Sequence, residues 1–103
     1  MAAELYINFE DKKWYLNNKD IIIQHIVSLE TFVHRLEEEF WLRDIHDDTY
    51  DYDARIFLNN NYIMLEIDYH PISIEESLTT LLKWMRKQTS IIVQDEDGEI
   101  SGW

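Results

Sequence analysis

The 103-residue sequence has no cysteine, only two glycines and one proline, and no long hydrophobic run. Without cysteine the chain has neither a disulfide framework nor a thiolate zinc site. With two glycines it cannot form the glycine-rich loop that binds phosphate groups in many enzymes. No stretch approaches the roughly 18 consecutive apolar residues of a membrane span, and the N-terminal segment lacks a signal-peptide pattern. We therefore expect a cytoplasmic protein that does not interact with a membrane.

Basic residues are scarce as well, since nine Lys and Arg stand against 21 Asp and Glu, for a formal net charge of −12. The excess is uneven: residues 30–53 carry nine acidic and two basic side chains, and residues 95–103 carry four acidic and no basic side chains. Direct nucleic-acid binding is not expected, because phosphate contacts need a surface of Lys and Arg. Concentrated acidic residues produce instead a potential that attracts a basic partner.

The residues that are present predict a single globular domain over residues 1–103, with 46% hydrophobic and 14% aromatic side chains. The stretch "ELYINFEDKKWYLNN" alternates apolar and polar residues around a turn at residues 11–13, which predicts a β-hairpin. "ARIFLNNNYIMLEIDYH" predicts a second hairpin, because the asparagines at positions 59–61 tolerate the backbone angles of a tight turn.

Between these hairpins, apolar residues recur from Asp20 onward at spacings of four and three, which predicts one long helix with one apolar stripe. The stripe consists of Ile22, Ile26, Leu29, Val33, Leu36 and Phe40. An alternative makes residues 21–23 a strand and starts the helix at Ser28, because a β-branched run disfavours a helix. We prefer the long helix.

"SIEESLTTLLKWMRK" predicts a second helix, with Ser73 and Glu76 in the spacing of a capping box. The final "SIIVQDEDGEISGW" predicts a strand, a turn at Asp97 and Gly98, and a short return. The expected order is thus ββαββαβ. This order predicts an α+β fold, a mostly antiparallel sheet with two helices packed on it.

The most unusual segment is "RDIHDDTYDYD", residues 43–53, which follows "LEEEFW". Glutamates at the end of the predicted long helix would oppose its dipole, so stability does not explain them. The segment is either a solvated loop or a binding surface, and the interleaved aromatic residues favour a surface with interface anchors inside an acidic rim. The predicted partner-binding residues here are Glu37, Glu38, Glu39, Trp41, Asp44, Asp47, Asp48, Tyr50, Asp51, Tyr52 and Asp53. Asp95, Asp97 and Trp103 form a second candidate patch.

Metal binding and catalysis are the remaining interpretations. His46 and the aspartates around it offer metal ligands, but their spacing matches no established metal-binding loop, and a hairpin turn explains "DEDGE". None of His25, His34 and His70 is paired in the sequence with a nucleophile or an orienting carboxylate. We therefore expect no cofactor, no metal site and no enzymatic activity.

In size, charge and the acidic-aromatic stretch "WLRDIHDDTYDYD", the chain resembles the bacterial immunity proteins of contact-dependent growth inhibition and colicin systems. The resemblance implies a tight complex with a cognate protein toxin that has a basic surface. Such a toxin is often a nuclease, whose cleft is blocked by carboxylates at phosphate positions. The alternatives are a nucleic-acid-mimic inhibitor of the anti-restriction or anti-CRISPR type and a small metal-dependent regulatory domain. The sequence leaves the oligomeric state open.

Overall fold

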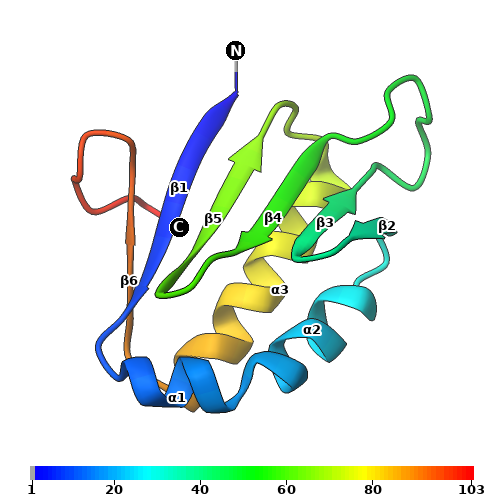
Figure 1. Cartoon of the computed structure of the whole chain (residues 1–103). Coiled ribbons are helices and arrows are strands. Elements are labelled where there is room, and N and C mark those ends of the chain that lie inside the picture. The colour runs from blue at the N-terminus through cyan, green and yellow to red at the C-terminus, as the bar shows by residue number, and fades with distance from the viewer. Residues whose placement is uncertain (1) are drawn as a thin grey trace.

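The computed structural model describes residues 2–103, which form a six-stranded antiparallel sheet and three helices. The sheet has the strand order β2-β3-β4-β5-β1-β6, so the first strand of the chain lies inside the sheet (Figure 1). The predicted α+β class is confirmed, whereas the order of the elements differs from the expected ββαββαβ. Along the chain the elements are β1 (Ala3–Phe9), α1 (Lys12–Asn17), α2 (Lys19–Val27), β2 (Phe32–Leu36), β3 (Glu39–Leu42), β4 (Ala54–Leu58), β5 (Tyr62–Ile67), α3 (Ile72–Gln88) and β6 (Ile91–Gln94).

Alternation along the strands gives the sheet one buried face and one open face. Where β1 pairs with β5, Leu5 lies opposite Leu65, and both side chains are buried. The neighbouring pair, Tyr6 and Met64, belongs to the other face and is only half-buried. Successive side chains of a strand point to opposite sides, so this pattern places the core on one side of the sheet.

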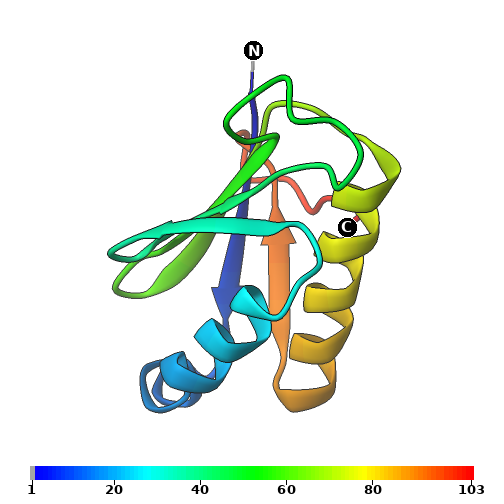
Figure 2. The same cartoon turned by 90° about the vertical axis from the view of Figure 1, so that its right-hand side faces the viewer.

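The helices cover the buried face of the sheet, and α3 runs along it (Figures 1 and 2). The apolar face of α3 is completely buried, as are Ile22 and Ile26 of α2. Within residues 2–103 no helix covers the opposite side, which we call the open face. The buried apolar residues of α3 are Ile74, Leu78, Leu81, Leu82 and Met85.

The predicted N-terminal hairpin is wrong in its second half. β1 forms as expected, but residues 12–17 are helix α1, because Asp11 caps it and accepts a hydrogen bond from the backbone N–H of Trp14 at 3.1 Å. Tyr15 turns into the core, where its hydroxyl donates to the carbonyl of Asn59 at 2.6 Å. β1 pairs instead with β5 and β6, which lie far away in the sequence.

The long helix predicted from Asp20 to Phe40 is wrong as well, and so is its alternative. The helix is α2, which ends at Val27, and the rest of the stretch is the hairpin β2–β3. The turn of this hairpin includes Glu37 with a φ of 57°, a left-handed conformation. Spacings of three and four residues suggested a single apolar stripe, but Val33 and Leu36 are 41% and 56% exposed.

The remaining elements were predicted correctly except for one cap. The hairpin β4–β5, helix α3 and strand β6 all form, and Gly98 takes a φ of 80° in the final turn. The chain then returns to pair Ile100 with Gln94. No capping box forms at α3, because Pro71 occupies the N-cap position and the Ser73 hydroxyl donates to Asp44 instead.

Candidate protein-binding surface

The acidic segment predicted from the sequence is the loop between β3 and β4, which we call the acidic loop (residues 43–53). It extends from one end of the sheet, at the upper right of Figure 1. Its two ends are joined by Asp53, whose carboxylate accepts the backbone N–H of Asp44 at 2.7 Å. The N–H of Asp53 donates to Leu42 at 2.8 Å, and its carbonyl accepts the N–H of Asp68 at 2.8 Å. The loop therefore leaves the sheet with both ends anchored.

Asp53 was predicted to contact a partner, but its side chain is 6% exposed and is used inside the protein. Asp44, which is half-buried, accepts the hydroxyl of Ser73 at the start of α3. The Asp53 carboxylate closes the base of the acidic loop, and the Asp44 carboxylate holds the loop to the start of α3. They belong to the support of the surface rather than to the part that a partner can reach.

The exposed carboxylates of the loop are those of Asp47, Asp48 and Asp51. None of the three forms an ion pair within the described residues. Asp47 accepts both the hydroxyl and the backbone N–H of Thr49, and these two bonds hold its pKa below the usual value. The loop therefore presents three carboxylates to solvent.

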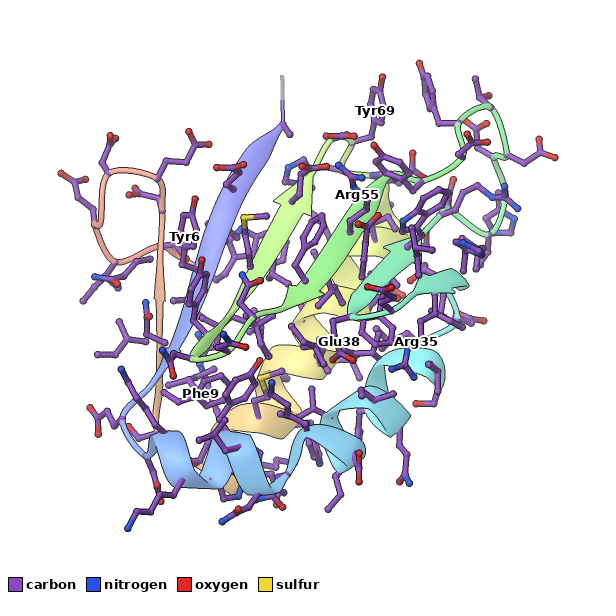
Figure 3. The ribbon with its side chains drawn as sticks, in the orientation of Figure 1. Tyr6, Phe9, Arg35, Glu38, Arg55 and Tyr69 are labelled. Carbon is purple, nitrogen blue, oxygen red and sulfur yellow. The ribbon has the colours of Figure 1, made fainter. Side chains whose placement is uncertain are left out.

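Two tyrosine rings lie exposed beside these charges. Tyr50 of the loop stacks on Tyr69, which follows β5, with ring centroids 4.3 Å apart and an angle of 11° between the rings. The rings are 46% and 43% exposed, and Figure 3 shows Tyr69 at the same end of the sheet as Arg55. Tyr69 was not singled out from the sequence, because only the approach of the loop to the end of β5 brings it next to Tyr50.

Two further predicted aromatic residues, Trp41 of β3 and Tyr52 near the end of the loop, pack together. Trp41 and Tyr52 have ring centroids 5.1 Å apart, and the indole N–H of Trp41 donates to Glu39 at 2.5 Å. Arg55 lies over the Tyr52 ring at 4.4 Å and forms ion pairs with Glu39 at 3.3 Å and with Glu66 at 2.6 Å. Glu39 is therefore neutralised within the protein, and Arg55 is a residue that the sequence did not reveal as part of this surface.

The structure separates the remaining predicted residues from the acidic loop. Glu37 and Glu38 lie in the β2–β3 turn at the opposite end of β3, where Glu38 pairs with Arg35 at 3.5 Å (Figure 3). Asp95 and Asp97 lie in the turn after β6, at the other edge of the sheet. Trp103 folds back and packs on the core, with its ring 6.2 Å from His70. The predicted acidic residues thus lie in four places: the acidic loop, the β2–β3 turn, strand β3 at Glu39, and the turn after β6.

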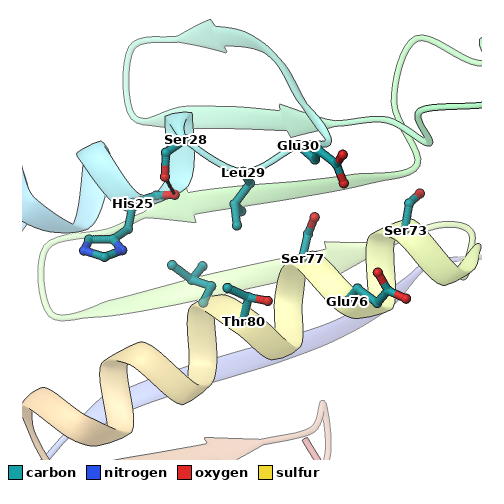
Figure 4. Close-up of a pocket in the computed structure, with 9 residues that line it drawn as sticks. His25, Ser28, Leu29, Glu30, Ser73, Glu76, Ser77 and Thr80 are labelled. Carbon is teal, nitrogen blue, oxygen red and sulfur yellow. Dashed lines mark hydrogen bonds between the residues drawn. The ribbon is translucent and has the colours of Figure 1, made fainter.

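Two connected hollows lie along the start of α3, and the first of them adjoins the acidic loop. One, of about 440 Å³, lies between the loop and the start of α3 and contains Glu30, Asp44 and Glu76. The other, of about 250 Å³, continues from it along α3 to His25 at the end of α2 (Figure 4). Ser73 and Ser77 point from α3 toward the segment that carries Leu29 and Glu30. The hollow beside the loop therefore carries three carboxylates, and the hydroxyl groups lie mainly in the hollow that continues along α3.

Three further findings bear on what the molecule can do. Within residues 2–103 no three His, Asp or Glu side chains come together in a group that could hold a metal ion. In the same range no helix combines the length and the apolar character that crossing a membrane requires. Comparison with known protein families and with curated proteins finds no match for this chain.

Proposed function

We propose that the protein is an acidic inhibitory binding protein of the immunity type, which neutralises a cognate bacterial toxin by tight association. The observation that carries the proposal is the stacked, exposed Tyr50–Tyr69 pair, because Tyr50 shares an anchored loop with three exposed carboxylates that form no ion pair within the described residues. Exposed aromatic rings supply contact area at low entropic cost, and surrounding charges accelerate encounter with a partner of opposite charge. A basic toxin domain, such as a nuclease, fits this combination.

The anchoring of the loop also supports a tight complex. Asp53 and Asp44 fix both ends of the loop, so binding does not need to order it. A surface that is already in its bound conformation loses less conformational entropy on association. The acidic hollow between the loop and α3 offers a place for a basic side chain of the toxin.

The test uses the protein encoded directly upstream, where a toxin gene lies in systems of this type. We expect the two purified proteins to form a complex whose association rate falls as salt rises from 0.01 M to 0.1 M, because the Debye length shortens from about 30 Å to about 10 Å. Replacing Asp47, Asp48 and Asp51 together by Asn should slow association at least about tenfold, with unchanged circular dichroism.

A matched control removes the same number of charges elsewhere. Glu10→Gln, Asp20→Asn and Glu99→Gln change exposed residues outside the loop, and the triple variant should keep full affinity. The proposal is wrong if the upstream protein does not bind. It is also wrong if the loop variant and the control variant lose affinity equally, because the loop would then contribute only net charge.

A further inference from the structure

A separate hollow, of about 350 Å³, lies on the open face at the edge of the sheet formed by β1 and β6. It contains no residue of the acidic loop, which joins strands nearer the other edge (Figure 1). Tyr6 lies next to it, beside the turn that follows β6 (Figure 3). The hollow is lined by Tyr6, Asn8, Tyr62, Gln94, Asp95, Glu96 and Gly98.

The walls of this hollow are held in place by hydrogen bonds. Asn8 donates to Gln94 at 2.9 Å, and Gln94 donates to the carbonyl of Gly98 at 2.9 Å, so the turn is joined to β1. A carboxylate oxygen of Glu96 accepts the backbone N–H of Glu4 at 3.0 Å, which ties the turn to β1 a second time. These bonds leave the hollow formed before any ligand arrives.

Two aromatic rings line it. Tyr6 and Tyr62 have ring centroids 6.0 Å apart, with an angle of 51° between the rings. The hydroxyl of Tyr6 donates to Glu4 at 3.0 Å, which orients the Tyr6 ring. Glu96 is exposed at the rim, and within residues 2–103 its second carboxylate oxygen makes no hydrogen bond or ion pair. Tyrosine faces and carboxylates both attract a cation.

The same face of the sheet shows which cation fits such a set of groups. Arg55 lies over Tyr52 at 4.4 Å and over Phe57 at 5.2 Å, and it pairs with two glutamates, Glu39 and Glu66. A guanidinium is planar, so it can stack on a ring and bond to a carboxylate at its edge at the same time. The hollow at β1 and β6 offers the same kinds of group as the surroundings of Arg55, two aromatic rings and a carboxylate, and none of its lining residues is basic.

We propose that this hollow binds an arginine side chain of a partner protein, with the guanidinium over the rings of Tyr6 and Tyr62 and bonded to Glu96. A phosphate group does not fit, because the lining contains carboxylates and no basic residue. A second copy of this chain is disfavoured because each copy carries a net charge of −12. The inference does not depend on the toxin-binding role of the acidic loop, since the two surfaces share no residue.

The experiment uses capped arginine, Nα-acetyl-arginine N-methylamide, as the probe and follows the backbone amides by NMR. We expect shifts at Tyr6, at Tyr62 and in the turn 94–98. The capped lysine analogue should bind more weakly, because an ammonium does not stack on a ring. The capped citrulline analogue, which keeps the shape and lacks the charge, should cause no shifts.

Two variants test the residues, and a third serves as the control. Tyr62→Leu and Glu96→Gln should each lower the affinity for capped arginine at least about threefold, as expected for a lost cation–π or charge-assisted contact. Glu96 is exposed and its replacement keeps the acceptor for Glu4, so Glu96→Gln tests the site even if Tyr62→Leu does not fold. Asp51→Asn removes one negative charge from the acidic loop, as Glu96→Gln does from the hollow, and it should leave the affinity for capped arginine unchanged.

Three results would overturn the proposal. The first is equal binding of the citrulline analogue, which would remove the role of the charge. The second is a set of shifts centred on the acidic loop, or affinity that is insensitive to Glu96→Gln, which would show nonspecific attraction to an acidic protein. The third is binding of free arginine about tenfold more tightly than capped arginine, which would indicate an amino-acid site.

Discussion

Two aspartates in the acidic loop, two positions apart, have different roles because of burial. Asp53 is 6% exposed and bonds to the N–H of Asp44, whereas Asp51 is exposed and unpaired within the described residues. A buried carboxylate is retained only where donors satisfy it, and Asp53 has a donor at 2.7 Å. Asp51 has no structural task, so it is free to serve a partner.

Replacing Asp53 by Ala should lower the free energy of unfolding by about 1–3 kcal/mol, because the N–H of Asp44 loses its acceptor. Asp51→Ala should change it by less than about 0.5 kcal/mol, as for exposed positions in general. Urea unfolding followed by circular dichroism measures both values. Similar losses for the two variants would mean that Asp53 does not anchor the loop.

At the scale of elements, the hairpin β2–β3 depends on a turn that the sequence does not announce. Glu37 adopts a φ of 57°, and its carbonyl accepts the Nε–H of Arg35 at 2.7 Å. A left-handed conformation costs a residue with a side chain roughly 1–2 kcal/mol, and glycine avoids this cost. The turn is thus a strained point in a hairpin that forms the edge of the sheet.

Glu37→Gly should therefore raise the free energy of unfolding by up to about 1 kcal/mol. The relief of strain in the folded state exceeds the extra conformational entropy that a glycine loses when the chain folds. The bond from Arg35 survives, because it uses the backbone carbonyl. Glu38→Gly, at the next position with an ordinary φ, should leave stability unchanged or lower it. Thermal and urea unfolding of the two variants provide the measurement. A less stable Glu37→Gly variant would show that the left-handed turn carries no strain.

At the scale of the whole molecule, the net charge of −12 is a cost to the folded state. The sheet distributes it over its periphery, with the acidic loop near one edge, the 95–99 turn at the other, and the β2–β3 turn at the far end of β3 (Figure 1). Self-repulsion of this kind weakens when salt screens the charges.

The melting temperature should therefore rise when NaCl increases from 0.01 M to 0.1 M, as the Debye length falls from about 30 Å to about 10 Å. The triple variant Glu10→Gln, Asp20→Asn and Glu99→Gln, with three fewer charges, should show a smaller rise. Differential scanning calorimetry at constant pH measures both. A melting temperature that falls with salt in this range would mean that local ion pairs outweigh the global repulsion.

The sequence by itself determined the α+β class, the hairpin β4–β5, helix α3, strand β6 and the acidic loop. Their signals are local: a run of asparagines at a turn, an apolar face at helical spacing, and charges gathered in one segment. The loop's membership in the candidate surface followed from composition alone. In contrast, the roles of Asp53 and Asp44 as anchors could not be predicted from composition, because burial depends on how the whole chain folds.

Only the tertiary structure decided where β1 lies, what residues 28–40 form, and which side chains meet on the open face. A spacing of three and four residues favours a helix, but in the hairpin that forms instead only Phe40 of the last three stripe residues is buried, while Val33 and Leu36 are exposed. The choice depends on the rest of the sheet, where Phe40 and Leu42 complete the core against β4. Likewise Tyr6 meets Tyr62, and Tyr50 meets Tyr69, through pairings between distant segments. Such contacts depend on the burial of one common core, which no local pattern encodes.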